Sequence, residues 1–512
     1  MKSKWTDCLA LAAIVAVAAW LRLHLLGDHG LWVDEGFSVH FVHMRWGQFW
    51  RVAWSREANM LLYYLLLRPW AHFAVTEFQI RLLSVLFGLA GVGMIYVLGR
   101  DLFGRATGII AAALLAIHAF HVYYSQEARS YSLTIFLLMF SAWLFARFVR
   151  EPSRRNRVAY VVTAALAFYA HIFALLVIVS QWLSFLLWSR FIPITRSQVP
   201  DFNSPPPSPC SRIPAPHSPL LKPRSLFPAI RLFGLLALPL LVFAIFKNKG
   251  QLDWIPPLTW KVFMSGFVAV TGQGGAWLMA RYLALALVAV ICTLCSGDTG
   301  KRFAVLLMLG WALFPIAVFA LYSLHKPLFL DRYLVLLVPA FVLLAAHGVA
   351  TLASWGSPLR LLWIPALALL LALSARATWR QYDTTKWLDW QTPTHYVVSN
   401  MQPGDVLCFT APGSESFWYY WQREKQFDWY DLPQTYYKNG TLCTLPFSDL
   451  AAEKNDSLRR VWLITTIATP EQRQWILGIL APRFGSPQVR QEFARPPLKL
   501  MVELLPGRDS NR

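Results

Sequence analysis

The amino-acid sequence predicts a polytopic α-helical membrane protein that ends in an α/β domain. Of its 512 residues, 56% are hydrophobic and only 14% are charged, which is far from the composition of an average soluble domain. The apolar residues form repeated runs of about 17 to 25 residues, the length that crosses a bilayer. Beyond residue 379 these runs stop and ordinary mixed sequence begins.

The first apolar run, near 7–26, follows Lys2 and Lys4 and therefore starts like a secretory signal. It is longer than the apolar part of a typical signal, and no small-residue cleavage site follows it before Asp34. We interpret it as a retained first span, with a cleaved signal as the alternative.

Further apolar runs continue to residue 378, so we treat 1–378 as the membrane domain. At about 17 to 25 residues per crossing, they predict about eleven spans. The spans are expected near 7–26, 82–99, 107–123, 131–148, 158–170, 172–189, 229–246, 276–295, 303–322, 332–350 and 360–378.

Arginine-rich connections between the spans predict the orientation. They are "GRDLFGR", "RFVREPSRRNR" and the Pro- and Ser-rich stretch 191–228. Basic short loops stay in the cytoplasm, and alternate crossing from a cytoplasmic N-terminus places all three there. The net charge of +20 is explained by this pattern, so we expect no nucleic-acid partner. We expect 191–228 to be a mobile cytoplasmic linker, because its composition cannot bury a core; binding of a partner by its Pro-rich part is the alternative.

Residues 379–512 are expected to form an extracytoplasmic α/β domain. "GDVLCFTA" and "RVWLITTIA" have the pattern of buried strands. "TPEQRQWILGILAPRF" begins with Thr and Pro before a helical pattern. The stretch "ESFWYYWQREKQFDWY" has aromatic side chains suited either to stacking on a sugar or to core packing.

The predicted topology brings several polar residues to the extracytoplasmic ends of the spans. They are Asp34 and Glu35 after the first span, Glu127 and Arg129, His171, and Asp331 with Arg332 and Tyr333. Any one of them can be a solvated helix cap. Together they predict a reaction site, because Arg recognises phosphate through its planar fork and a carboxylate can act as a general base. The loop 27–80, rich in Trp, Tyr and Arg, is expected to form amphipathic helices at the interface beside this site.

Four stretches resemble motifs of the C-type (GT-C) membrane glycosyltransferases: "LWVDEGFSVHF", "YYSQEARSYSLTIF", "FYAHIFALL" and "DRYLVLLVPA". The similar branch contains the dolichyl-phosphate-mannose protein mannosyltransferases and the lipid A aminoarabinose transferase. The resemblance implies the GT-C fold and a sugar donor carried on a polyprenyl phosphate. It implies that Asp34 is the catalytic base, that Glu35 supports it, and that the donor phosphate and sugar meet the residues Glu127, Arg129, His171, Arg332 and Tyr333.

The chain departs from that family in its first loop. Many members carry His-Pro-Pro there, whereas this chain reads "EANMLLYYLLL". The resemblance then assigns Asn59, in place of that His, and Tyr63 to the acceptor side. Glu35 and Glu127 are carboxylates of the kind that bind Mg²⁺ or Mn²⁺, but the sequence completes no metal-ligand set.

The resulting hypothesis is an inverting hexosyl or pentosyl transferase of the plasma membrane that acts on the extracytoplasmic face. A protein, a lipid or a cell-envelope glycan remains open as the acceptor, and the sugar is open as well. The alternative is a transporter or lipid flippase without glycosyl transfer. Transporters place their polar residues near the bilayer midplane, whereas these residues lie at one face, which favours the enzyme.

Overall fold

The computed structural model of the chain forms two compact units. The helical unit comprises residues 1–24, 53–63 and 82–381, and the mixed unit comprises residues 25–52, 64–81 and 382–512. The structure describes residues 2–191, 222–246, 255–356, 358–383, 389–402, 405–409, 414–425, 460–466, 470–495 and 498–506. Most of the predicted linker, residues 192–221, lies outside this set, so its mobility and its side of the membrane stay predictions.

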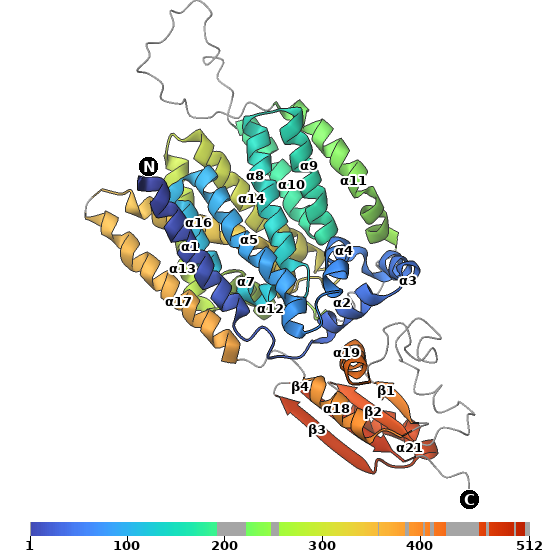
Figure 1. Cartoon of the computed structure of the whole chain (residues 1–512). Helices are drawn as coiled ribbons and strands as arrows, with labels where there is room; N and C mark the ends of the chain where they lie inside the picture. The colour runs from blue at the N-terminus through green and yellow to red at the C-terminus, as the bar shows by residue number, and fades with distance from the viewer. Residues whose placement is uncertain are drawn as a thin grey trace, which may run out of the picture. The chain divides into compact units, whose positions relative to one another are not determined.

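Apolar helices of different lengths build the helical unit (Figure 1). They are α1 (Lys2–Leu23), α5 (Glu77–Phe103), α6 (Arg105–Ala116), α7 (Ala119–Ser125), α8 (Tyr131–Arg150), α9 (Arg154–Ala170), α10 (Ala174–Phe191), α11 (Phe227–Phe246), α12 (Trp260–Val270), α13 (Gly275–Cys295), α14 (Thr299–Tyr322), α15 (Asp331–Leu334), α16 (Val338–Ala353) and α17 (Trp363–Asp383). Every predicted span coincides with one of these helices or with a consecutive pair of them.

Length and hydropathy together select which of these helices can cross a membrane. Within the described ranges, seven helices are long and apolar enough to cross a membrane, or eight if α6 and α7, which are bent by 62°, form one broken span. Helices α9, α10 and α17 do not meet that test. Arginines at the start of α9 and near the end of α17 lower their hydropathy. The predicted polytopic helical class is confirmed, and the count of about eleven stays a prediction.

The span Asp331–Ala353, most of which is α16, is the most deeply buried of the candidate spans, with 89% of its most apolar stretch inside the protein. Within it, α16 has the closest neighbours. It packs mainly against α13 and α6. The approach to α13 is so close that a Cβ on Gly348 would lie 2.1 Å from the carbonyl oxygen of Leu285. A glycine is therefore required there, because any side chain would push the two helices apart.

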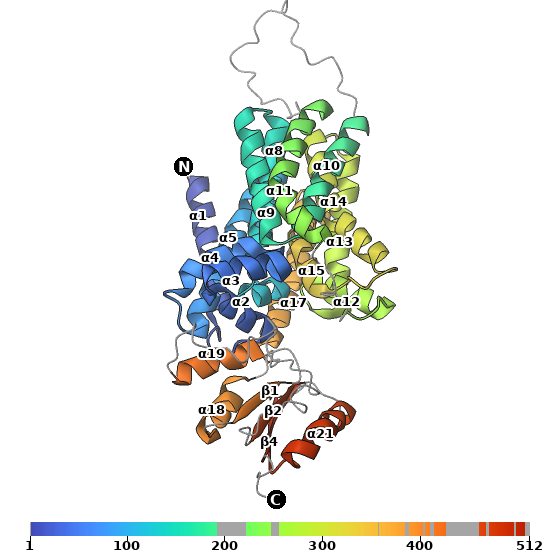
Figure 2. The ribbon, with the colours of Figure 1, turned by 90° about the vertical axis from the view of Figure 1, so that its right-hand side faces the viewer.

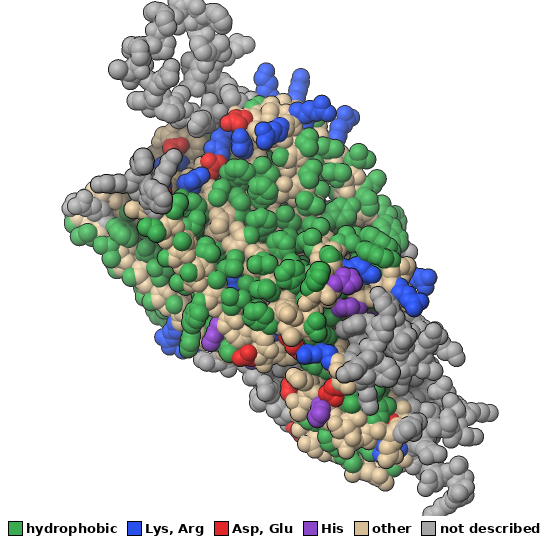
Figure 3. Space-filling model, viewed as in Figure 1, with side chains coloured by type: hydrophobic (Ala, Val, Ile, Leu, Met, Phe, Trp, Pro, Cys, Tyr) green, Lys and Arg blue, Asp and Glu red, His purple; other side chains and the backbone are tan. Residues whose placement is uncertain are grey.

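Lysine and arginine side chains gather at one end of the helical unit (Figure 3). They include exposed arginines of the α5–α6 and α8–α9 connections: Arg100, Arg105, Arg147, Arg154 and Arg155. Because α8 runs from Tyr131 to Arg150 and α9 returns from Arg154 to Ala170, the segments before α8 and after α9 lie at the other end. The predicted donor residues Glu127, Arg129 and His171 thus lie at the end opposite the arginine-rich connections.

The mixed unit combines the first loop with the C-terminal region. The loop folds into α2 (Val33–His43), α3 (Trp46–Val52) and α4 (Leu61–Ala71), each too short to cross a bilayer. Their place at the membrane interface stays a prediction. The C-terminal part contains α18 (Gln391–Asn400), β1 (Val406–Phe409), α19 (Ser414–Lys425), β2 (Val461–Thr466), α21 (Pro470–Phe484), β3 (Val489–Arg495) and β4 (Leu498–Leu505).

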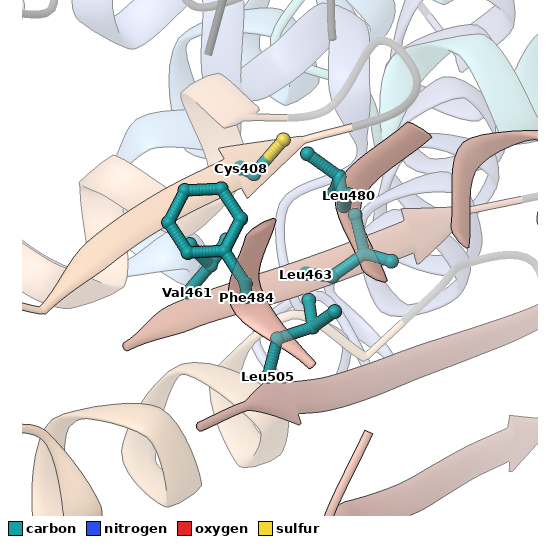
Figure 4. Close-up of a cluster of buried hydrophobic side chains, with 6 residues drawn as sticks. All are labelled: Cys408, Val461, Leu463, Leu480, Phe484 and Leu505. Carbon is teal, nitrogen blue, oxygen red and sulfur yellow. The ribbon is translucent and has the colours of Figure 1, made fainter. Parts of the chain in front are cut away.

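The four strands form one mixed sheet in the order β1-β2-β4-β3. β1 pairs with β2 in parallel, and the other two pairs are antiparallel. Helix α21 packs on one face, where its side chains close the cluster of Cys408, Val461, Leu463, Leu480, Phe484 and Leu505 (Figure 4). Helices α18 and α19 belong to the other face (Figure 2), where Tyr396 of α18 meets Trp462 and Phe417 of α19 meets Phe409. The predicted α/β domain is confirmed, as are the two predicted strands and the helix after them.

Candidate functional site

Arg129 and Arg332 are two cations near the neutral side chain of His171 in the helical unit; we call these three residues the cation cluster. His171 follows α9, and the charges of Arg129 and Arg332 both act on its imidazole. Aromatic rings enclose the same imidazole: ring centroids lie 5.8 Å away at Tyr131 and 6.2 Å away at Tyr333. Segments that are about 200 residues apart in the sequence thus meet. The structure brings together four residues that were predicted to bind the donor: Arg129, His171, Arg332 and Tyr333.

The His171 imidazole is a neutral hydrogen-bond donor. Its Nδ1 accepts the backbone N–H of Phe173 at 3.2 Å, so the proton resides on Nε2. Burial, together with the charges of Arg129 and Arg332, lowers the pKa of His171 to about 3. Nε2 is buried and has no hydrogen-bond partner within the described part of the chain. Because a buried donor is costly unless it is bonded, the N–H beside two guanidinium groups suits an anionic oxygen.

A chain of hydroxyl groups supports the turn that carries Arg129. The hydroxyl groups of Tyr63 and Ser84 lie 2.8 Å apart, and Ser84 Oγ donates to the carbonyl oxygen of Arg129 at 3.1 Å. Ser132 donates to the carbonyl of Ser84 at 2.8 Å. Asn59 accepts the backbone N–H of Ile172, next to His171, at 3.2 Å. The structure therefore places Tyr63 and Asn59 against the backbone of the cation cluster, and their part on the acceptor side stays a prediction.

Glu127 lies in the same turn and is 1% exposed. Its charge acts on the hydroxyl of Tyr124, as does the charge of Asp331. The ring of Tyr124 is 4.6 Å from that of Tyr131, which links Glu127 to the wall of the cation cluster. Glu127 therefore lies near residues that were predicted to bind the donor, and its own role there stays a prediction.

Arg22 anchors the break between α6 and α7 from within the first span. Its guanidinium donates to the carbonyl oxygens of Leu115 at 3.2 Å and Ala116 at 2.9 Å, which end α6, and to His121 Nδ1 at 2.8 Å. In return, the Gln126 amide donates to the carbonyl of His24 at 2.8 Å. These hydrogen bonds provide partners for backbone carbonyl groups that have no partner within a helix at its end. They fix α7, and with it the turn that holds Arg129.

Helix α2, which carries Asp34 and Glu35, begins at a buried ion pair in the mixed unit. Arg81 Nε and Nη2 donate to the two oxygens of Glu35 at 2.9 and 2.7 Å. The remaining N–H groups of Arg81 donate to the carbonyl oxygens of Leu26, His29 and Gly30. Both side chains are almost completely buried. Removing one partner of such a pair costs about 3–5 kcal/mol, so Glu35 holds the loop in shape around Arg81.

Asp34 lies in the first turn of α2 and is half-buried. Glu35 Oε2 accepts the backbone N–H of Trp32 at 3.4 Å, and Ser38 donates to the backbone carbonyl of Asp34 at 2.8 Å. The positive end of the helix dipole favours a carboxylate at this position. Of the two adjacent carboxylates, Glu35 is therefore completely buried against Arg81, while Asp34 is half-buried.

No group of three or more His, Cys, Asp or Glu suited to a metal ion occurs in the described ranges. The oxygens of Glu35, one of the two predicted metal ligands, accept hydrogen bonds from Arg81. These residues do not complete a site for Mg²⁺ or Mn²⁺. We derive no step through a metal, and no cofactor is established.

Sequence reasoning did not single out Arg22 or Arg81. Each is an arginine in or beside an apolar run, and an ionisable residue in such a place signals a specific partner. The partners are backbone carbonyls, the imidazole of His121 and the carboxylate of Glu35. Most of them are distant in the chain, so no local motif predicts them.

The cation cluster has the charge that suits an anionic group, and it lies at one end of a bundle of apolar helices. Residues 61–200 match the family model of dolichyl-phosphate-mannose-protein mannosyltransferase. The structure of ArnT from Cupriavidus metallidurans in the apo state is 13% identical, with 98% of each chain covered and a TM-score of 0.55. The same protein bound to undecaprenyl phosphate is 12% identical, with 98% of each chain covered and a TM-score of 0.56.

The apo oligosaccharyltransferase from Archaeoglobus fulgidus is 13% identical, covers 78% of this chain and 59% of its own, and has a TM-score of 0.49. No protein of curated function matches the chain in a sequence comparison. The family match and the ArnT fold confirm the resemblance to C-type membrane glycosyltransferases that the motifs predicted.

Proposed function

We propose that the protein is an inverting glycosyltransferase that moves a sugar from a polyprenyl phosphate to an acceptor on the extracytoplasmic face of the plasma membrane. The observation that carries this proposal is the cation cluster of Arg129, His171 and Arg332. Two guanidinium groups and a buried N–H donor suit a phosphate. ArnT, which has the same fold, has been solved with undecaprenyl phosphate bound, and this supports a lipid phosphate as the donor.

In the proposed reaction, a hydroxyl or amine of the acceptor attacks the anomeric carbon of the sugar. The bond between that carbon and the phosphate oxygen breaks, and its electron pair leaves with the polyprenyl phosphate. The proton of the acceptor passes to Asp34, the half-buried carboxylate of α2. Arg129 and Arg332 stabilise the leaving phosphate, which is already a stable anion and needs little acid assistance. Whether the sugar is a hexose or a pentose depends on the shape of the pocket that binds it.

Mass spectrometry of lipid-linked sugars and glycosylated products tests this function in cells with and without the gene. We expect loss of one glycosylated product and accumulation of one polyprenyl-phosphate sugar when the gene is absent. Complementation by the wild-type chain should restore both, and complementation by Asp34→Asn should restore neither. Unchanged products together with a changed distribution of a lipid between leaflets would instead support the transporter alternative.

The extracytoplasmic placement follows from the arginine-rich connections, and cysteine labelling tests it. In a chain whose other cysteines are replaced, Cys210 of the linker should resist a membrane-impermeant maleimide in intact cells. A cysteine placed at residue 450 should react. Labelling of Cys210 but not of residue 450 would contradict the orientation, and permeabilised cells provide the control for reactivity.

A further inference from the structure

Helix α19 of the C-terminal region has two different buried faces. Phe417 and Trp418 point toward the sheet, where their rings lie 5.1 and 6.2 Å from Phe409. Ser416, Tyr419, Tyr420 and Arg423 follow at spacings of three, four and seven residues and share the opposite face. Both tyrosines are 2% exposed. The described part of the aromatic stretch, residues 415–425, therefore packs its rings in a core.

The second face of α19 lies directly against α2 within the mixed unit. A Cβ on Gly36 would be 2.5 Å from Ser416 Oγ and 2.7 Å from the backbone nitrogen of Ser416. No side chain fits in that space unless one helix moves. The backbones of the two helices thus touch at the residue that follows Glu35.

Tyr420 holds the strand-like segment that leads into α2. The backbone N–H of Leu31 donates to Tyr420 Oη at 2.8 Å, and Leu31 is completely buried. Burial raises the pKa of Tyr420, so its phenol stays protonated and neutral. Because no water reaches this amide, loss of the hydroxyl would leave a buried N–H without an acceptor.

The same face of α19 also contacts the segment that leads into α5. Tyr419 donates to the carbonyl oxygen of Val75 at 3.0 Å, and Arg423 forms an ion pair with Glu77 at 2.7 Å. The segment 30–36 contains Glu35, and the segment 75–77 comes shortly before Arg81 in the sequence. One helix of the C-terminal region therefore binds the chain close to both partners of the ion pair from which α2 starts.

We propose that α19 is a positioning element for α2, and that the C-terminal domain serves the reaction by fixing the first turn that carries Asp34. Ser416 and Tyr420 are its positioning residues. This inference rests on the proposed function, because it gives Asp34 a role in transfer. A displacement of about 1 Å at a reacting group can cost about 10²-fold in rate, so such a support has a measurable effect.

The test compares Tyr420→Phe with Tyr396→Phe in the full-length protein in lipid nanodiscs. Both changes remove one phenol hydroxyl from the C-terminal region, but Tyr396 lies against Trp462 and Phe493 on the sheet. For Tyr420→Phe we expect turnover to fall about tenfold with an unchanged apparent KM for the donor, as expected for misplacement of a reacting group. Hydrogen exchange of the peptide covering 27–41 should become at least about tenfold faster, because the bond to the Leu31 amide is lost. Tyr396→Phe should change neither quantity.

Gly36→Ala provides a second variant that leaves α19 itself intact. The added methyl group overlaps Ser416, so we expect at least about a tenfold loss of turnover and faster exchange over 27–41. Gly47→Ala is the matched control, because a Cβ at Gly47 meets nothing within 4 Å. If either readout of Tyr420→Phe equals that of Tyr396→Phe, or Gly36→Ala behaves like Gly47→Ala, the positioning role is wrong.

These outcomes separate the inference from the proposed function. If Asp34→Asn abolishes transfer while Tyr420→Phe is normal in turnover and exchange, the function stands and the inference fails. If no glycosylated product depends on the protein, the function fails, and the positioning role fails with it. The exchange data would then still report on the contact between α19 and α2.

Discussion

Replacing Asp34 with Asn is expected to lower sugar transfer by at least about 10²-fold, the low end of the effect of losing a general base. The substitution preserves the shape of the side chain but removes the group that takes the proton of the acceptor. Folding should be unaffected, because the buried ion pair that shapes the loop belongs to Glu35 and Arg81. Turnover in membranes, normalised to the amount of protein, is the measurement.

Asp28→Asn is the matched control, since Asp28 is an exposed aspartate of the same loop. It should leave transfer unchanged. Glu35→Gln should act differently from Asp34→Asn: it leaves the Arg81 charge buried without its counterion, so the yield of folded protein should fall with transfer. If Asp34→Asn retains near wild-type turnover while folded Glu35→Gln has none, the role of base belongs to Glu35. If neither change matters, the proposed mechanism is wrong.

Arg129→Ala and Arg332→Ala are each expected to weaken binding of undecaprenyl phosphate by about tenfold or more, because a hydrogen bond to a charged group contributes about 1.5–3 kcal/mol. The corresponding Arg→Lys variants should recover only part of the affinity, since an ammonium group lacks the planar fork of guanidinium. Binding of undecaprenyl phosphate to the purified protein and titration of the donor in membranes are the two measurements.

Arg154→Ala is the control for nonspecific loss of positive charge. Arg154 is exposed in the arginine-rich connection before α9, at the end of the helical unit away from the cation cluster. Its removal should change neither the affinity for undecaprenyl phosphate nor the apparent affinity for the donor. If Arg129→Ala and Arg332→Ala both use the donor and bind undecaprenyl phosphate normally, these arginines do not belong to the donor site. The proposed role of His171 beside them would then be wrong as well.

The sequence alone was sufficient for the class of protein and for most of its helices. Apolar runs of bilayer length are local signals, because a helix in a membrane must satisfy its own backbone hydrogen bonds. The strands β1 and β2 and helix α21 were predictable for a similar reason, since their apolar patterns are contained within a few residues. The motifs around Asp34, Arg129, His171 and Arg332 also lie in short stretches, which is why their resemblance to a family was visible.

Tertiary structure decided how these residues are supported. No local pattern pairs Glu35 with Arg81 or Arg22 with the end of α6, because their partners are carbonyl groups or side chains up to about a hundred residues away. It also decided that the first loop packs with the C-terminal region, where Gly36 meets Ser416 nearly 400 residues later. Such contacts depend on how buried polar groups find partners once the chain has folded, and hydrophobic periodicity contains no information about that choice.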